Sequence, residues 1–533
     1  MRASTDRRTP AEWIGRAALD LLPLGLAAGM LLALTMVEGL SHDEHQFVAA
    51  GWLLGNQGLL PYRNFPFHHL PNLALLYAAI ARLSSTPLLI DRLLSVAFGV
   101  GTLAFLYAQA RGRLQALGFW PAWMTAVAVT VFLVLSPLFK YANTKAWNHA
   151  LPTFLTLLAW ALHLRARRGE RPTLWLASGG LLGIAAGTRS TFLAVFVPFV
   201  LFALGRRGTR LKWRNVLLFT AGTLPGLAPS LLFAALSPWK FLYGNVIYPL
   251  QNTRYRELLL HEDAMDLPGK LAYFTDRVVL YPGHLPLALA GLWLGYRVLL
   301  RNREAKARDL QDVWLALGTA LFLWIGGMVP TPSWYQYFYA PLPFAVLAAV
   351  CMLRWASPRP GLVLVAAGLL LGFLVNLRAD YIRRFPVLLQ PDEWVPVQVH
   401  AVGRAVADRL RAGRVLTLGP IFPIEGGLQI YPAFATGSLT WRVSPFMAGE
   451  PRRKYGVIAP EDLPAYLEPM PPAAVLVGFE LHTTGFSLDD PGELELPLVR
   501  YALARGYRRS SIECAVCDDR RLYLWQPAPQ AGR

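Results

Sequence analysis

Residues 38–71 read "EGLSHDEHQFVAAGWLLGNQGLLPYRNFPFHHLP" and bring three carboxylates and four histidines together between two apolar runs. Asp43 and Glu44 follow the end of the first run by only a few residues. Carboxylates at the edge of a membrane must be solvated, paired or part of a functional site. The stretch 47–58 resembles an amphipathic segment that lies on the membrane surface. This arrangement predicts an acidic pair where a lipid-borne headgroup would meet a water-borne acceptor. The other interpretation is a polar loop with solvated charges.

Long apolar runs must position this loop. The 533-residue chain is 54% apolar with a mean hydropathy of +0.37, and its excess of apolar residues is concentrated before residue 378. The pattern predicts a polytopic α-helical membrane protein with about eleven spans. They fall at 17–37, 71–85, 90–110, 119–139, 149–165, 174–203, 215–236, 284–300, 312–329, 337–355 and 361–377. The run 174–203 is interrupted by "GTRS", so it is one tilted helix or two short ones.

Charge follows the same division. Residues 378–533 carry a net charge of +1, and the rest of the chain carries +17. A basic balance in membrane loops predicts contact with lipid headgroups and no nucleic acid partner. The basic stretches 206–214 and 301–308 predict a cytoplasmic side, which places the loop 38–70 and the tail outside. The basic residues at 111–113 and 165–171 disagree with this topology.

The tail predicts a second domain. We divide the chain into a membrane domain, 1–377, and a soluble α/β domain, 378–533. Buried strands are expected at 414–419 and 473–479, a helix at 498–507 and a closing strand at 521–527, and residues 395–413 have helical spacing. Cys514 and Cys517 predict a disulfide or two free thiols, because a zinc site usually needs a second cysteine pair.

The opening loop is similar to the first extracytoplasmic loop of GT-C glycosyltransferases that use lipid-linked donors. This group includes protein O-mannosyltransferases and the aminoarabinose transferase of lipid A. The resemblance rests on Asp43-Glu44, Gly58, "PYRNF" (61–65) and "HHLP" (68–71). Weaker similarity continues through "GTRS" and "PSWYQYFYAPLPF", over roughly residues 15–355. Two departures stand out: Leu70 separates the histidines from the proline, and "NTKAWNHALP" (143–152) lacks the acid that the family often has there.

The resemblance implies transfer of a sugar, with inversion, from a polyprenyl-phosphate donor to an acceptor hydroxyl. Such a reaction needs a base for the hydroxyl proton and cations for the departing phosphate. The resemblance makes Asp43 the candidate base and places Glu44 beside it in the catalytic pair, orienting, pairing or merely solvated. The sugar and the acceptor are not readable from the sequence.

Basic and aromatic residues are the candidates for binding the substrates. Arg189 lies within an apolar run, where a lipid phosphate is a natural partner and snorkelling to the interface is the alternative. Arg254 and Arg256 lie among aromatic residues in an outer loop and bind either the donor phosphate or headgroups in general. Tyr335, with Tyr337, lines the pocket or belongs to an aromatic belt. Two adjacent histidines, His68 and His69, bind phosphate or sugar, or are simply packed.

Other classes of function have less support. No phosphate-binding loop is present, which disfavours ATP-driven transport. A secondary transporter or flippase of lipid-linked sugars is the main alternative, although the spans lack deep acidic residues for proton relay. A polymerase or ligase of lipid-linked polysaccharide is a third. The histidines lack metal-ligand spacing, and we predict no metal and no cofactor. The expected location is the inner membrane of a bacterium.

Overall fold

The computed structural model describes residues 10–528, apart from 170, 208–209, 260–264, 282, 302–309, 354, 356–367, 369–373, 375–383, 411–412, 448, 481–493 and 518–519. The expected span at 361–377 and the domain boundary at 377/378 therefore lie almost wholly outside the described residues.

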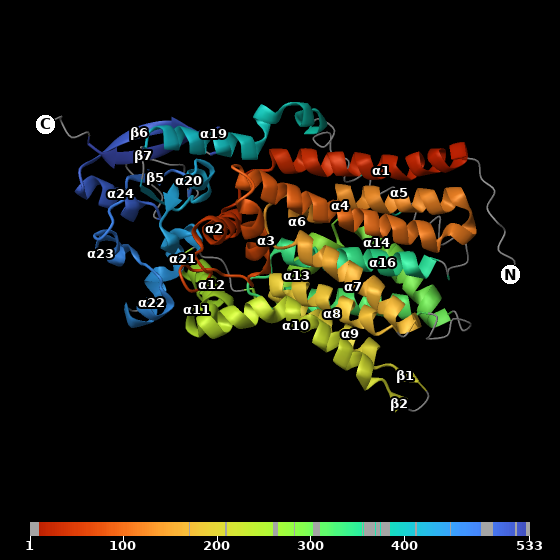
Figure 1. Ribbon diagram of the computed structural model, residues 1–533. Coiled ribbons are helices and arrows are strands. Elements are labelled where there is room, and N and C mark those ends of the chain that lie inside the picture. The colour runs from red at the N-terminus through yellow and green to blue at the C-terminus, as the bar shows by residue number, and fades with distance from the viewer. Residues whose placement is uncertain are drawn as a thin grey trace.

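Helices dominate the first 353 residues and many of them run in a common direction (Figure 1). They are α1 (Pro10–Val37), α2 (His42–Gln57), α3 (Asn72–Ala81), α4 (Pro87–Arg113), α5 (Phe119–Leu135), α6 (Pro137–Asn143), α7 (Ala150–Gly169), α8 (Pro172–Thr188), α9 (Phe196–Leu204), α10 (Trp213–Leu236), α11 (Pro238–Leu242), α12 (Tyr248–Leu259), α13 (Leu267–Phe274), α14 (Leu285–Gly295), α15 (Gln311–Met328) and α16 (Pro341–Leu353). Each described apolar run of the sequence forms helix.

Fewer of these helices can cross a membrane unaided than the eleven runs predict. Among the described residues, four are long and apolar enough, at Gly15–Val37, Pro87–Arg113, Trp213–Leu236 and Tyr335–Leu353. A fifth arises if α5 and α6 count as one span bent by 67°. The run 174–203 does break at Arg189, whose extended backbone separates α8 from a 3-10 turn at Ser190–Val195.

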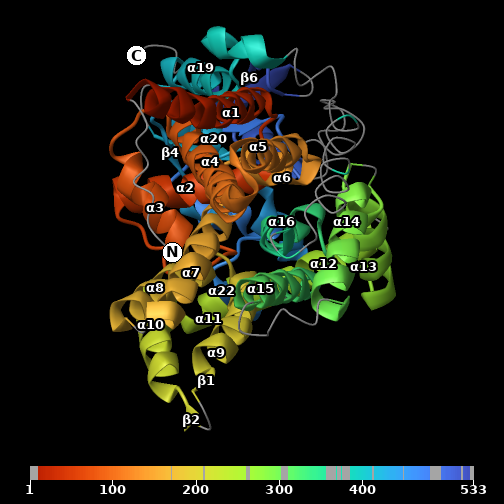
Figure 2. The same cartoon turned by 90° about the vertical axis from the view of Figure 1, so that its right-hand side faces the viewer.

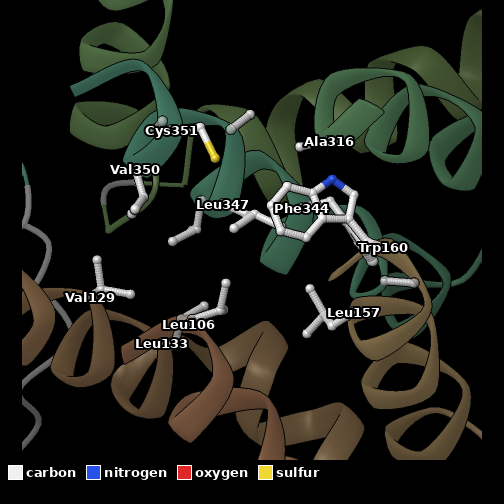
Figure 3. Close-up of a cluster of buried hydrophobic side chains, with 14 of the residues drawn as sticks. Leu106, Val129, Leu133, Leu157, Trp160, Ala316, Phe344, Leu347, Val350 and Cys351 are labelled. Atoms are coloured by element: carbon white, nitrogen blue, oxygen red, sulfur yellow. The ribbon is translucent and has the colours of Figure 1, made fainter. Parts of the chain in front are cut away.

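The bundle core consists of aliphatic and aromatic side chains from helices that are far apart in sequence. Figure 3 shows Leu106 of α4, Leu133 of α5, Trp160 of α7 and Phe344 of α16 converging in one cluster. All four are essentially buried. Figure 2, which turns the cartoon by 90°, shows α15 and α16 between the α7–α10 group and α13–α14.

A mixed sheet with short helices follows the bundle, with strand order β4-β3-β5-β7-β6. The strands are β3 (Arg414–Thr417), β4 (Gln429–Ile430), β5 (Ala474–Val477), β6 (Tyr507–Glu513) and β7 (Arg521–Pro527). The helices are α19 (Val395–Asp408), α20 (Ile421–Glu425), α21 (Ser438–Val443), α22 (Gly449–Tyr455), α23 (Leu463–Leu467) and α24 (Leu496–Ala504). Both predicted strands at 414–419 and 473–479, the helix at 498–507 and the closing strand are confirmed. Cys514 and Cys517 form a disulfide.

The sheet lies at the same end of the bundle as α2, α11 and α12 (Figure 1). The hairpin of β1 (Arg206–Arg207) and β2 (Arg210–Leu211) lies at the opposite end. The structure therefore gathers the loop 38–70, the 237–259 segment and the C-terminal segment at one end, as the predicted topology requires.

Helix α2 corrects the expectation of a surface-lying segment at 47–58. Its residues from Glu44 to Gly51 are all buried. Gly51 and Gly55 let α2 approach α3 closely, because a Cβ on Gly51 would lie 2.5 Å from the Cβ of Tyr77. The helix is therefore a packed element, and it holds its N-terminal residues rigidly.

Candidate active site

A cavity of about 360 Å³ opens where α2, the 141–149 segment, α12 and α21 meet. It collects five of the sequence-predicted residues, although its lining comes from segments up to 400 residues apart. These five are Asp43, His68, His69, Arg189 and Arg256. Further lining residues include Phe47, Tyr141, Asn148, His149, Tyr248, Asn252, Trp334, Tyr337, Leu439 and Arg442.

Asp43 lies in the first turn of α2. Ser41 caps this helix, because its hydroxyl accepts from the Asp43 N–H at 3.4 Å and its own N–H donates to the Glu44 carboxylate. In the described part of the chain, the Asp43 side chain has no ion-pair partner within 4.0 Å and accepts no hydrogen bond. Asp43 is thus a half-buried carboxylate that faces the cavity with its oxygens available to a ligand.

Glu44 has a different environment, and it is absent from the cavity lining. Its Oε1 accepts from Arg92 Nε at 2.9 Å and from the Ala146 N–H at 2.8 Å. Its Oε2 accepts from Arg92 Nη2 at 2.8 Å and from the Ser41 N–H at 3.0 Å. Glu44 and Arg92 side chains are both 0% exposed. The carboxylate is fully engaged in fixing α2 to α4 and to the 143–150 segment, which corresponds to the orienting or pairing role that the sequence left open for Glu44.

Arg189 is the buried cation of the cavity and is 7% exposed. Its Nη1 donates to Asn148 Oδ1 at 2.7 Å and lies 3.3 Å from His149 Nε2. The guanidinium also stacks over the Tyr337 ring, 4.7 Å from its centroid. Among the described residues no carboxylate lies within 4.0 Å of it. A buried guanidinium held only by neutral groups retains its full charge for a ligand.

The stretch 143–152, which lacks the expected acid, contacts the Arg189 guanidinium and the Glu44 carboxylate. It supplies Asn148 and His149 to Arg189 and the Ala146 N–H to Glu44. Neutral oxygen and nitrogen acceptors orient the guanidinium without cancelling its charge.

His68 and His69 both line the cavity but face different partners. His68 stacks on Tyr248 at 3.6 Å between centroids, and its Nε2 shares a 2.8 Å hydrogen bond with Thr440 Oγ1. His69 stacks on Phe47. Burial and the Arg189 charge lower the pKa of His69 to about 3, although Asp43 opposes this shift. Burial, followed by the charges of His69 and Arg442, holds the pKa of His68 well below its usual range. Both rings are therefore neutral at neutral pH.

Two further arginines line the cavity. Arg256 of α12, which the sequence pointed to, stacks over Trp334 at 4.2 Å. Arg442 of α21 was missed, because nothing local distinguishes it among the tail's basic residues. Its Nη2 donates to Asn252 Oδ1 at 2.7 Å and to the Tyr248 hydroxyl at 3.4 Å. Three arginines against one carboxylate make the described lining strongly cationic.

Besides Glu44, two predicted residues are not in the lining. Arg254 is exposed and lies 5.8 Å from the Phe446 ring. Tyr335 packs against Tyr141, with 6.1 Å between centroids, while Tyr337, two residues later, does line the cavity. The described part of the chain also holds no group of three or more His, Cys, Asp or Glu side chains that fits a metal ion.

Comparison with known proteins supports the fold. No protein family and no curated protein matches the sequence. Among solved structures, ArnT from Cupriavidus metallidurans superposes over 98% of this chain and 100% of its own, with a TM-score of 0.56 and 15% identity. The chain has a GT-C fold. The predicted fold family is thereby confirmed.

Weaker similarity extends to two other solved structures. The oligosaccharyltransferase of Archaeoglobus fulgidus gives a TM-score of 0.44 at 12% identity, over 86% of this chain and 69% of that one. The arabinosyltransferase EmbB from Mycobacterium smegmatis gives 0.42 at 16% identity, over 65% and 31%.

Proposed function

We propose that this protein is an integral membrane glycosyltransferase that moves a sugar from a polyprenyl-phosphate donor to an acceptor hydroxyl. One observation carries the proposal. Among the described residues, a single available carboxylate, Asp43, faces a cavity lined by three arginines, of which Arg189 is buried with no carboxylate within 4.0 Å. A fold shared with ArnT and the motif of the opening loop support the same function.

The chemistry divides between these groups. Asp43 accepts the proton of the acceptor hydroxyl while the hydroxyl oxygen bonds to the anomeric carbon from the face opposite the phosphate. The bond between the anomeric carbon and the phosphate oxygen breaks, and its electron pair leaves with the polyprenyl phosphate. Arg189 and Arg256 stabilise the charge that develops on that phosphate. Attack opposite the leaving group inverts the anomeric configuration.

The same proposal includes the side of the membrane that each part of the protein faces. The cavity and the C-terminal segment would lie on the extracytoplasmic side, with the β1–β2 hairpin in the cytoplasm. The basic residues 206, 207 and 210 of that hairpin favour this orientation by the positive-inside rule.

The test compares a deletion strain with strains that express wild-type protein or Asp43→Asn. Mass spectrometry of glycolipids and glycoproteins should find a sugar-bearing product that is lost on deletion and restored by wild type only. General-base catalysis contributes about 10²–10⁴-fold, so Asp43→Asn should restore almost none of it. Full restoration by Asp43→Asn would refute the assignment of the base.

A second measurement addresses a transporter or flippase. Purified protein in detergent has no membrane across which to move a lipid. If it releases polyprenyl phosphate from a synthetic polyprenyl-phosphate sugar when extract supplies acceptor, it transfers the sugar. Transport in reconstituted vesicles without such release would favour the alternative.

A further inference from the structure

The cavity presents its arginines on two separate frameworks. Arg189, at the end of α8, is oriented by Asn148, His149 and Tyr337. Arg442 of α21 is instead oriented by Asn252 and Tyr248 of α12. No residue is common to the two sets of contacts, so these cations form two distinct positions in one cavity.

The Arg442 position has unfilled hydrogen-bonding capacity. Its Nε is buried and donates to no protein atom, and no carboxylate lies within 4.0 Å of the guanidinium among the described residues. Leaving a buried donor of a charged group unpaired is unfavourable, because the donor has given up its hydrogen bonds to water. The Asn252 and Tyr248 contacts use only Nη2, and Arg442 lines the cavity, so the guanidinium can still receive an anion from the cavity side.

Asp43 is within electrostatic range of both arginines. In the proposed reaction the donor phosphate and the acceptor hydroxyl must meet at Asp43. With Arg189 holding the donor phosphate, the Arg442 position is left for the other substrate. With a neutral acceptor the guanidinium would have no anion in direct contact, because Asp43 and Glu480 act on it only from beyond 4.0 Å.

We propose that the acceptor is itself acidic and that Arg442 binds its phosphate or carboxylate group. This inference rests on the proposed function. It makes Arg442 a specificity-determining residue that the C-terminal segment contributes to the membrane-embedded site. It also gives His68 a positioning role, because the hydrogen bond from His68 to Thr440 ties α21 to the first loop two residues from Arg442.

Binding of two small anions to the detergent-purified full-length protein tests the inference without requiring transfer. The donor probe is geranyl phosphate. The acceptor probes are glycerol phosphate and glycerate, which carry a hydroxyl with a phosphate or a carboxylate respectively. We expect an acceptor probe to bind in the presence of saturating geranyl phosphate, which would show that the two anions occupy different sites. The acceptor probe that binds more tightly identifies the acid group as a phosphate or a carboxylate.

Single substitutions should then separate the sites. Arg442→Gln should weaken binding of the preferred acceptor probe about 10- to 100-fold, since each 1.4 kcal/mol is tenfold and a hydrogen bond to a charged group is worth about 1.5–3 kcal/mol. The same substitution should change the affinity for geranyl phosphate by less than about threefold. Arg189→Gln should show the reverse pattern. Arg453→Gln, an exposed position on α22, is the matched control and should change neither.

Two results would overturn the inference. One is competition between geranyl phosphate and the acceptor probes, which would mean a single anion site. The other is equal loss of both ligands in Arg442→Gln with an unchanged unfolding midpoint. Failure of the proposed function is distinguishable, since it would appear as a deletion strain that has lost no glycolipid or glycoprotein sugar, whatever the binding data show.

Discussion

Substitution of two adjacent carboxylates should have different effects: loss of Glu44 should lower stability, and loss of Asp43 should lower transfer activity. Glu44→Gln replaces one carboxylate oxygen by an amide nitrogen that cannot accept the hydrogen bonds now made there. It also leaves Arg92 charged and 0% exposed without its counter-ion. Removing one partner of a buried ion pair costs about 3–5 kcal/mol. Asp43→Asn removes no described hydrogen bond to its carboxylate, so we expect it to cost much less stability than Glu44→Gln.

The assay follows thermal unfolding of detergent-purified protein by tryptophan fluorescence at one fixed heating rate, because membrane proteins often unfold irreversibly. Glu44→Gln should lower the apparent midpoint clearly, and its transfer activity should fall no further than the loss of folded protein explains. Asp43→Asn should keep the wild-type midpoint and lose about 10²–10⁴-fold in transfer.

A double variant, Glu44→Met with Arg92→Met, provides the control. It removes both charges, so it should recover part of the lost stability. Recovery should be incomplete, because Arg92 also donates to the carbonyl oxygens of Thr35, Glu38 and Gly39, which would lose that donor. A Glu44→Gln protein with the wild-type midpoint and the activity loss of Asp43→Asn would refute the structural role of Glu44.

Three further outcomes follow from the contacts described. Arg189→Ala should raise the apparent KM for synthetic polyprenyl-phosphate sugar much more than that for acceptor, with partial recovery in Arg189→Lys, which keeps the charge but loses the guanidinium fork; unchanged donor dependence would contradict the phosphate-binding role. The contribution of the His400–Glu425 pair to stability should fall as pH rises from about 5 to 8, because the pKa of His400 is raised by its 2.9 Å hydrogen bond to Glu425 and that of Glu425 is raised by burial, so this pair binds more protons in the folded state than in the unfolded one; the stability difference between wild type and His400→Gln should therefore shrink over this range, and a difference that stays constant with pH would contradict it. In a background without Cys514 and Cys517, a cysteine at exposed Leu503 should react with an impermeant maleimide in intact cells, and one at exposed Trp213 only after lysis; the opposite pattern would invert the proposed topology.

Local sequence patterns were enough to predict the helices, the site residues of the first loop and Arg189. Apolar runs predicted the described bundle helices because each run is long enough to bury a helical face. The break at Arg189 was visible as a charged residue in such a run. Fewer described helices are long and apolar enough to count as spans than the eleven predicted runs, since several, such as α3 and α14, are short.

Long-range pairing is what local patterns could not supply. Arg92 lies within the run 90–110, and a buried arginine needs a counter-ion. Its partner, Glu44, lies 48 residues earlier, and no local pattern connects the two. The burial of α2 depends on Gly51 and Gly55 meeting α3, which amphipathic spacing does not reveal. Arg442 enters the cavity only because the sheet places α21 against α12.

The choice of Asp43 over the histidines as base follows from their surroundings. His69 is close to Arg189, and its pKa of about 3 makes it a poor acceptor for a hydroxyl proton. His68 already shares its Nε2 with Thr440. Asp43 alone combines negative charge, an available carboxylate and a rigid helical support. Its charge also offsets part of the positive field of Arg189 and Arg442 before the substrates arrive. Once it takes the hydroxyl proton that offset disappears, and the arginines act with full strength on the phosphate as it departs.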